Sequence, residues 1–267
     1  MSVQTLYTAA TGMESLETKL DVIANNLANI DTVAYKRDRA NFEDLFYRQI
    51  RLPGADQTSG MPTATGIELS LGSRVSSTQT DFDQGSFQTT GNPLDLAIEG
   101  SGFFMVEDPN GTGDPLYTRA GNLNLNADGE IVVGSASLGR RLQPPITVPP
   151  EATNISISPA GVVEVRVNNQ TQQIGTIELA TFINPDGLLK LGDNLYQQTE
   201  ASGDVIQNEP GQNGTGIIRQ TALEASNVEP VQELIDLITT QRAFELNSQV
   251  VQAGDQIMQL ISNLRRF

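Results

Sequence analysis

The sequence contains no cysteine, no histidine and no tryptophan. Without cysteine the chain can form no disulfide and has no thiol for catalysis or metal binding. Without histidine it lacks the commonest general base and the commonest zinc ligand. Its nine phenylalanines and five tyrosines are spread along the chain and do not predict the aromatic platform of a carbohydrate-binding module. These absences leave little chemistry for an enzyme, so we expect a non-enzymatic protein.

Basic residues are also scarce, because 16 Lys and Arg stand against 32 Asp and Glu, a formal net charge of -16. Residues 53–227 hold 20 of the acidic and 7 of the basic side chains. The two ends of the chain are therefore nearly neutral and could pack against copies of themselves without strong repulsion. An acidic chain is a poor partner for a phosphate backbone, so no nucleic-acid partner is expected.

Long apolar runs are missing as well. No stretch approaches the roughly 18 apolar residues of a membrane-spanning helix, so no membrane insertion is expected. The first residues, MSVQTLYTAATG, show neither the basic nor the apolar region of a cleavable secretory signal. Taken alone, this predicts a cytoplasmic location.

Heptad repeats dominate both ends of the chain. Near the N-terminus two sets recur every seven residues, and they comprise Leu6, Met13, Leu20 and Leu27, and Ala9, Leu16, Ile23 and Ile30. After Pro230 a first set comprises Leu237, Phe244, Val251 and Met258, and a second comprises Leu246, Val250, Ala253, Ile257, Leu260 and Leu264. At about 100° per residue, the two C-terminal sets lie on nearly opposite sides of one helix. Such a helix needs partners on two sides.

This arrangement predicts an α+β fold whose N- and C-terminal α-helices form a coiled-coil-like pair around a central all-β domain. We place the helices of this inner helical domain at 1–34 and 228–267. The apolar stripe that remains is then a docking surface for other copies. An ordinary amphipathic core helix is the alternative for residues 2–30.

In the middle of the chain, the spacing of apolar residues changes from the helical period to the alternation that is typical of β-strands. We expect a connector or hairpin region at 35–72, a central β domain at 73–202 and a second connector at 203–227. Short runs separated by Gly, Pro and Asn predict the strands, which are 67–71, 73–80, 94–98, 102–106, 123–125, 131–133, 155–158, 162–167 and 174–182. Aromatic and basic residues mix at 35–51, as in some nucleic-acid readers, but intervening acidic residues favour a packed loop or hairpin.

Three patterns in the β domain could suggest chemistry, and each has a simpler interpretation. Asn124, Asn126, Asp128 and Gly129 match the opening of a calcium loop. The twelfth position should be glutamate and is Ser135, so a β-turn is favoured. The glycines at 100 and 102 lack the third glycine of a dinucleotide site.

Paired carboxylates such as Asp81 with Asp83, or Asp95 with Glu99, could serve glycoside hydrolysis. Acidic pairs on solvated strands are common, however. The sequence therefore predicts no catalytic residue, no cofactor and no metal ligand.

Four segments carry a resemblance to a known family. They are ANNLANIDTVAYKR at 24–37, NPLDLAIEGSGFF at 92–104, YTRAGNLNLNADGEIV at 117–132 and LEASNVEPVQELIDLITTQRAFELNSQ at 223–249. In this order and spacing they resemble the rod and hook axial proteins of the bacterial flagellum, and Asn25, Asn26, Leu27 and Asn29 fall in the family's rod signature. Within the family the chain looks most like the distal rod members, with the larger proximal rod member as the alternative.

The resemblance implies a structural role in the flagellar basal body. Family members leave the cell through the flagellar type III export apparatus, which would place the chain in the periplasm-spanning rod without a cleavable signal. They assemble into a helical tube with the terminal helices inside and the β domain outside. The implied partners are copies of the chain itself, the proximal rod proteins, the hook protein, and the P- and L-ring proteins.

Overall fold

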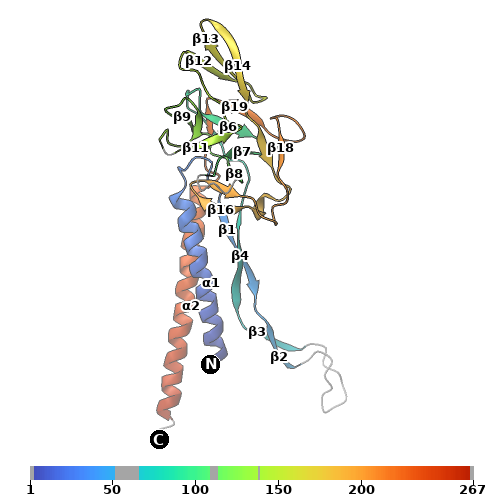
Figure 1. Cartoon of the computed structure of the whole chain (residues 1–267). Helices are drawn as coiled ribbons and strands as arrows, with labels where there is room; N and C mark the ends of the chain where they lie inside the picture. The colour runs from blue at the N-terminus through green and yellow to red at the C-terminus, as the bar shows by residue number, and fades with distance from the viewer. Residues whose placement is uncertain (1–2, 52–65, 109–113, 138, 265–267) are drawn as a thin grey trace. The chain divides into compact units, whose positions relative to one another are not determined.

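A computed structural model describes residues 3–51, 66–108, 114–137 and 139–264 (Figure 1). Two long helices, α1 (Val3–Ala28) and α2 (Pro230–Leu264), stand at the ends of the chain, and the region between them is mostly β. The predicted α+β class with terminal helices is thus confirmed. Neither helix of the described chain is long and apolar enough to cross a membrane.

The chain divides into two compact units. The first, called the helical unit, comprises Met1–Ala28, Asp38–Gln79 and Glu229–Phe267. The second, called the β unit, comprises Asn29–Arg37 and Thr80–Val228. Each unit is therefore built from segments that are far apart in the sequence.

The two helices of the helical unit pack antiparallel. Gly12 of α1 lies opposite Asn247 of α2, where an added Cβ would be 3.3 Å from the Asn247 Nδ2 atom, and Gly254 lies against Leu6. Near the other end, the Asn26 side chain lies 3.4 Å from the Glu233 carboxylate. Partner numbers thus fall along α2 as they rise along α1. Because α1 has 26 residues and α2 has 35, the last turns of α2 extend past the start of α1.

A two-stranded ribbon accompanies the helices. Its outgoing strands are β1 (Asp38–Asp44) and β2 (Tyr47–Arg51), and its returning strands are β3 (Ile67–Ser70) and β4 (Ser73–Thr80). β1 pairs with β4, and β2 pairs with β3. Gly72, with φ +122°, brings the ribbon so close to α1 that an added Cβ would overlap Thr11. The region predicted as a connector or hairpin therefore contains three strands that pair with no other part of the described chain beyond the ribbon.

The β unit is built around a nine-stranded sheet. Along the main path its strands are β16 (Leu189–Gly192), β17 (Leu195–Gln197), β8 (Leu116–Thr118), β7 (Phe103–Val106), β11 (Arg140–Gln143), β10 (Ile131–Val133) and β9 (Leu123–Leu125). β15 (Leu179–Thr181) pairs with both β7 and β18 (Ile206–Asn208). The short 3₁₀ helix η1 (Pro185–Gly187) precedes β16.

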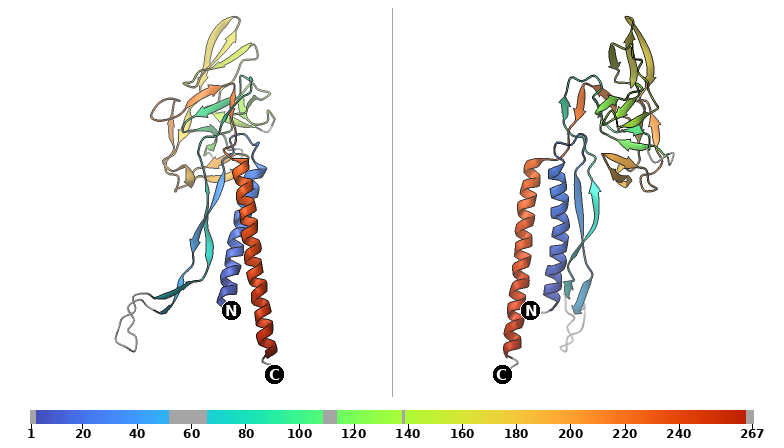
Figure 2. Two further views of the ribbon diagram at one scale, coloured as in Figure 1. Left: turned by 180° about the vertical axis from the view of Figure 1, so that it is seen from behind. Right: turned by 60° about the vertical axis from the view of Figure 1, so that its left-hand side comes forward.

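Smaller sheets complete the β unit. β12 (Asn154–Ile157), β13 (Val162–Val167) and β14 (Gln170–Thr176) form a three-stranded sheet, seen in yellow in Figure 2. β6 (Leu96–Glu99) pairs with β19 (Ile217–Gln220), and β5 (Phe87–Thr89) pairs with β20 (Ala222–Glu224). The stretch 203–227, predicted as a connector, therefore contains β18, β19 and β20.

Two clusters of buried side chains hold the β unit together. The larger is aliphatic and includes Leu96, Ile98, Leu123, Val163 and Ile177, all fully or almost fully buried. The smaller is aromatic, with rings in edge-on contact, such as Tyr117 and Phe182 at 4.8 Å between centroids. Edge-to-face packing adds to the stabilisation that burial of these rings provides.

Candidate functional site: an apolar helical surface

On α1 most of the predicted assembly residues are already partly covered. Ile23 is buried, and Leu6, Met13, Leu16, Leu20 and Leu27 are half-buried. Ile30 is half-buried but follows the end of α1. The N-terminal stripe therefore faces packed neighbours within the helical unit along most of its length.

On α2 the two predicted sets differ in exposure. Of the first set, Leu237, Phe244 and Val251 are half-buried, whereas Met258 is exposed. Of the second set, Leu246 is 61% exposed, Leu260 63% and Val250 42%, while Ile257 is half-buried. The side chain of Leu264 lies outside the described residues. The second stripe is thus largely open in the single chain.

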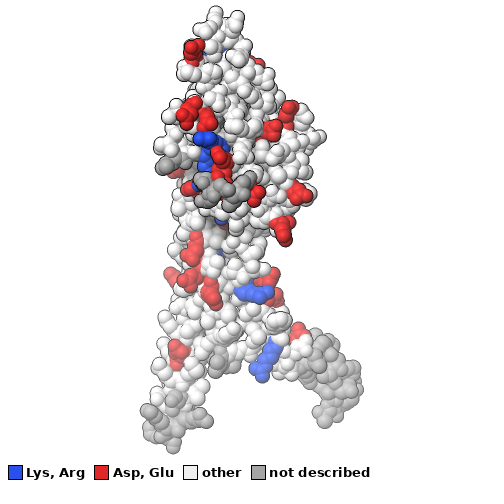
Figure 3. All heavy atoms as spheres, in the orientation of Figure 1, with Lys and Arg blue, Asp and Glu red and all other residues white. Residues whose placement is uncertain are grey.

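Sequence reasoning missed a further apolar group at the start of α2. Val231, Leu234, Ile235 and Ile238 follow the spacing of one helix face, and all are exposed, Val231 by 69%. These four residues do not continue the heptad spacing of the later sets, although they share one face of the helix. On the face shown in Figure 3, much of the surface over the C-terminal half of α2 is uncharged.

A groove in the helical unit adjoins the exposed stripe. It has a volume of about 410 Å³ and is lined by residues of α1, α2 and β3, namely Gln4, Thr5, Thr8, Ala9, Leu69, Ser70, Asn247 and Val250. The Gln4 Nε2 atom is buried and has no hydrogen-bond partner among the described residues. Because Val250 belongs to both, the groove and the exposed stripe of α2 form one continuous surface.

The signature asparagines have distinct positions. Asn26 is only 1% exposed; its Nδ2 donates to the Asp38 carbonyl at 2.8 Å, and its Oδ1 accepts from the Asp38 amide at 2.9 Å. It therefore ties the end of α1 to the start of β1. The Asn29 carbonyl accepts the Thr32 amide at 3.2 Å, which forms a turn after the helix. Asn25 is exposed and Leu27 half-buried.

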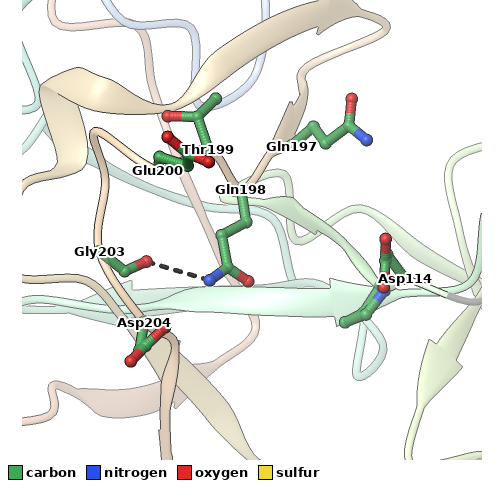
Figure 4. Close-up of a pocket in the computed structure, with 8 residues that line it drawn as sticks. Asp114, Gln197, Gln198, Thr199, Glu200, Gly203 and Asp204 are labelled. Carbon is green, nitrogen blue, oxygen red and sulfur yellow. Dashed lines mark hydrogen bonds between the residues drawn. The ribbon is translucent and has the colours of Figure 1, made fainter.

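The described part of the β unit has surface pockets. The pocket in Figure 4 is lined by amides and by the carboxylates of Asp114, Glu200 and Asp204, and Gln198 donates across it to the Gly203 carbonyl at 3.0 Å. Within the described residues, no group of three or more metal-ligating side chains is found.

The sequence resembling a calcium loop adopts the predicted turn. The Asn126 Oδ1 atom accepts the amides of Asp128 and Glu130 at 3.0 and 2.8 Å, and Gly129 has φ +79°. The side-chain oxygen that a metal would need is thus occupied by the backbone of the turn itself.

A buried ion cluster lies in the β unit. The Lys36 ammonium is 2.7 Å from Glu224 Oε1, and the Arg119 Nε is 3.4 Å from Glu224 Oε2. The Lys36 and Glu224 side chains are fully buried and that of Arg119 is 4% exposed. Burial lowers the pKa of Lys36, although Glu224 acts in the opposite direction. Burial likewise lowers the pKa of Arg119. Sequence reasoning missed this cluster, because its members are separated by up to 188 residues.

Three family models match the chain. The flagella basal body rod protein model matches residues 6–36, the flagellar hook protein FlgE/F/G D1 domain model matches 97–165, and the flagellar basal body rod FlgEFG protein C-terminal model matches 219–264. Flagellar basal-body rod protein FlgG of Caulobacter vibrioides is 43% identical over 98% of this chain and 100% of its own. FlgG of Buchnera aphidicola is 39% identical over 98% of this chain and 100% of its own. FlgG of Bacillus subtilis is 37% identical over 99% of this chain and 100% of its own. The chain belongs to the FlgG family of flagellar rod proteins.

As a member of the FlgG family, the chain is a structural subunit of the distal rod in the flagellar basal body. The distal assignment is favoured over the larger proximal rod member that the sequence left open. The family is structural and not enzymatic. The rod model covers nearly all of α1 and includes Lys36, and the C-terminal model covers all of α2 and includes Glu224. The helices and both ends of the buried ion pair thus lie in the matched segments.

Proposed function

We propose that the chain polymerises through its helical unit into the tube of the distal rod. Within one subunit the half-buried stripes of α1 and α2 form the coiled-coil-like pair. The exposed stripe of α2, with Leu246, Val250 and Leu260, then docks on other copies. The observation that carries this proposal is the exposure of these side chains on a helix whose opposite face is already covered.

The energetics favour assembly only where subunits are concentrated. Burying these three side chains contributes roughly 5–9 kcal/mol gross, at about 1.5–3 kcal/mol each. Loss of translational and side-chain freedom offsets much of this gain. Dilute subunits would therefore stay apart, whereas a subunit delivered to the growing tip would find a preformed apolar surface.

The remaining features of the proposal come from the family. The subunit would reach the tip through the flagellar type III export apparatus, continue from the proximal rod proteins and join the hook protein. The rod would span the periplasm through the P- and L-ring proteins. Neither nucleic acid nor membrane insertion has a part in this function. The predicted division at 1–34, 35–72, 73–202, 203–227 and 228–267 stays part of this proposal as the order of helical, connecting and β segments, with strands inside both connecting ranges.

The test is a matched pair of double variants, each supplied as the only copy in cells. Leu246→Asp with Leu260→Asp places two charges on the exposed stripe. Gln252→Asp with Gln259→Asp places the same charges on exposed polar positions outside both apolar sets. Electron microscopy of isolated basal bodies should show rods that stop before the distal segment in the first variant and complete rods in the second. Complete rods in both would refute the proposal, provided that circular dichroism of each purified chain shows an intact β unit.

A further inference from the structure

Three distant segments of the chain meet at one place in the β unit. The Ala34 amide donates to the Glu224 carbonyl at 2.8 Å, and the Asp81 amide donates to the Arg37 carbonyl at 2.8 Å. Asn227 joins all three segments, because its Oδ1 accepts the Arg37 amide at 2.7 Å and its Nδ2 donates to the Asp81 carbonyl at 2.9 Å. These are the segments by which the chain enters and leaves the β unit.

The ion cluster lies at this meeting point and contains two cations for one carboxylate. Besides Glu224, the Lys36 ammonium binds the Asp83 carbonyl at 2.7 Å, and the Arg119 guanidinium donates to the Gly100 carbonyl. Glu224 Oε1 also accepts the Gly85 amide at 3.0 Å. Each cation has a neutral carbonyl partner of its own, but among the described residues only Glu224 supplies an opposite charge to both.

Without Glu224 the cluster would hold two cations facing each other in a site closed to water. A buried unpaired charge is strongly unfavourable, and two like charges are worse. Lys36 and Arg119 must therefore stay hydrated until Glu224 arrives. Glu224 lies in β20, which pairs with β5. Its carboxylate therefore enters the cluster when β20 pairs with β5.

Strand order indicates when this event occurs. β7 with β8, β9 with β10, and β12 with β13 and β14 are all pairs between strands that follow one another in the sequence. In contrast, β19 and β20 return from the end of the unit to pair with β6 and β5. Contacts between distant residues carry the larger entropy of loop closure and tend to form late.

We propose that Glu224 is the closing residue of the β unit: its entry between Lys36 and Arg119 is the last step of folding and locks the entering and leaving segments together. The β unit then stays open until nearly all of its chain, to Asn227, is present. A chain that emerges from its N-terminus onward cannot complete this unit early. This closing step in the β unit is independent of the helical surface through which subunits dock.

Pulsed hydrogen exchange during refolding of the full-length chain tests the order directly. After dilution from denaturant, amides of β7, β8 and β13 should gain protection first. The amides that bind the closing segment or belong to it, those of Ala34, Gly85 and Ala225, should gain protection last and together. Protection of these three amides at the same time as β7 and β8, or before them, would overturn the proposal without any need for a variant.

Kinetics of variants provide a second test. Glu224→Gln should speed unfolding on the order of 100-fold while leaving the early protection of β7 and β8 unchanged. Adding Lys36→Met should slow unfolding again, because one of the two opposed cations is removed. If the double variant unfolds faster than Glu224→Gln alone, the three residues act as independent contacts and the proposal fails. The control is Glu43→Gln, in the exposed pair with Arg74 at 3.0 Å. It should change neither the rate of unfolding nor the early protection of β7 and β8.

Discussion

Lys36 lies in an environment that is unusual for a lysine. Its ammonium is fully buried, and burial lowers its pKa below the usual 10.5 even though Glu224 raises it, while Arg119 acts with burial. A lysine whose folded-state pKa is lowered binds fewer protons in the folded than in the unfolded chain over the interval between the two values. Stability must therefore rise with pH across that interval.

We predict that the free energy of unfolding of the β unit increases with pH across the alkaline interval that lies just below the ordinary lysine pKa, because the pKa of Lys36 is lowered in the folded chain. Lys36→Met should remove this increase. Denaturant unfolding at a series of pH values, followed by β-sheet circular dichroism, measures it. The series should end below pH 10.0, because burial also raises the pKa of Tyr117 above that value, which lowers stability at higher pH. A flat or falling profile in the unaltered chain would contradict the prediction.

Asn26 acts on the helical unit through both of its amide atoms. We predict that Asn26→Ala lowers the stability of that unit by about 2 kcal/mol, because the Asp38 amide and carbonyl lose their partner in a buried site. Asn26→Asp should cost more at neutral pH than in acid, since it places a carboxylate beside the Asp38 carbonyl and the buried Glu233. Helical circular dichroism in denaturant measures both variants. Glu17→Ala, at an exposed position of α1, should have little effect.

For single residues, the sequence predicted a side chain's partners only where those partners lie close by in the chain. The turn at Asn126 was predicted because its partners lie within four residues. From the sequence, Asn26 was assigned only to the family's rod signature, whereas in the structure its side chain binds residue 38 and lies 3.4 Å from the Glu233 carboxylate of α2. Lys36 and Glu224 gave no signal at all, because nothing in the sequence indicates which charges will be buried together.

Among the elements, the helices show how glycine sets the distance between neighbours. At Gly254 an added Cβ would overlap the Leu6 side chain. We predict that Gly254→Leu forces α1 and α2 apart and lowers the melting temperature of the helical signal, despite the better helix propensity of leucine. Leu6→Ala should restore much of the loss by making room for the new side chain.

The control for this pair is Ala253→Leu, one residue away and exposed. It brings the same leucine without entering the contact with α1, so the helical signal should melt no earlier than in the unaltered chain. Equal losses from the two leucines, or no rescue by Leu6→Ala, would show that α1 and α2 do not pack as described.

Strands were predictable where short runs of strand-compatible residues lie between turn residues. β4, β9, β10 and β13 begin and end at the predicted residues. The run 174–182 proved to contain the end of β14 and all of β15, which pair with different neighbours. Short strands such as β11, with the sequence RRLQ, were missed because a polar triplet or quartet has little intrinsic preference and becomes a strand only through its distant partners.

For the whole molecule, sequence patterns predicted helices around a β region, but not the interleaving of the chain. The start of the β unit, Asn29–Arg37, precedes the ribbon of the helical unit, and its main part follows that ribbon. The division follows from pairings such as β1 with β4 and β5 with β20. Composition and periodicity carry no information on these pairings, because each strand is compatible with many partners.

The helical unit should be less protected than the β unit in the free subunit. Its exposed apolar stripe has no cover within the described chain, and the last turns of α2 extend past α1, whereas the β unit has two buried clusters. Helices without a packed partner are marginal in water. We therefore predict fast amide exchange in residues 257–264, intermediate exchange in α1 and slow exchange in β7 and β8 of the dilute chain.

In isolated rods the same helical amides should become as slow as those of β7 and β8, because neighbouring copies would cover them. Exchange followed by mass spectrometry on the free subunit and on basal bodies makes the comparison within one chain, with the β unit as internal reference. Strong protection of α1 and all of α2 in the dilute subunit would mean that the helices are complete without copies. In that case the exposed stripe would not be what drives assembly, and a different surface would have to join the subunits.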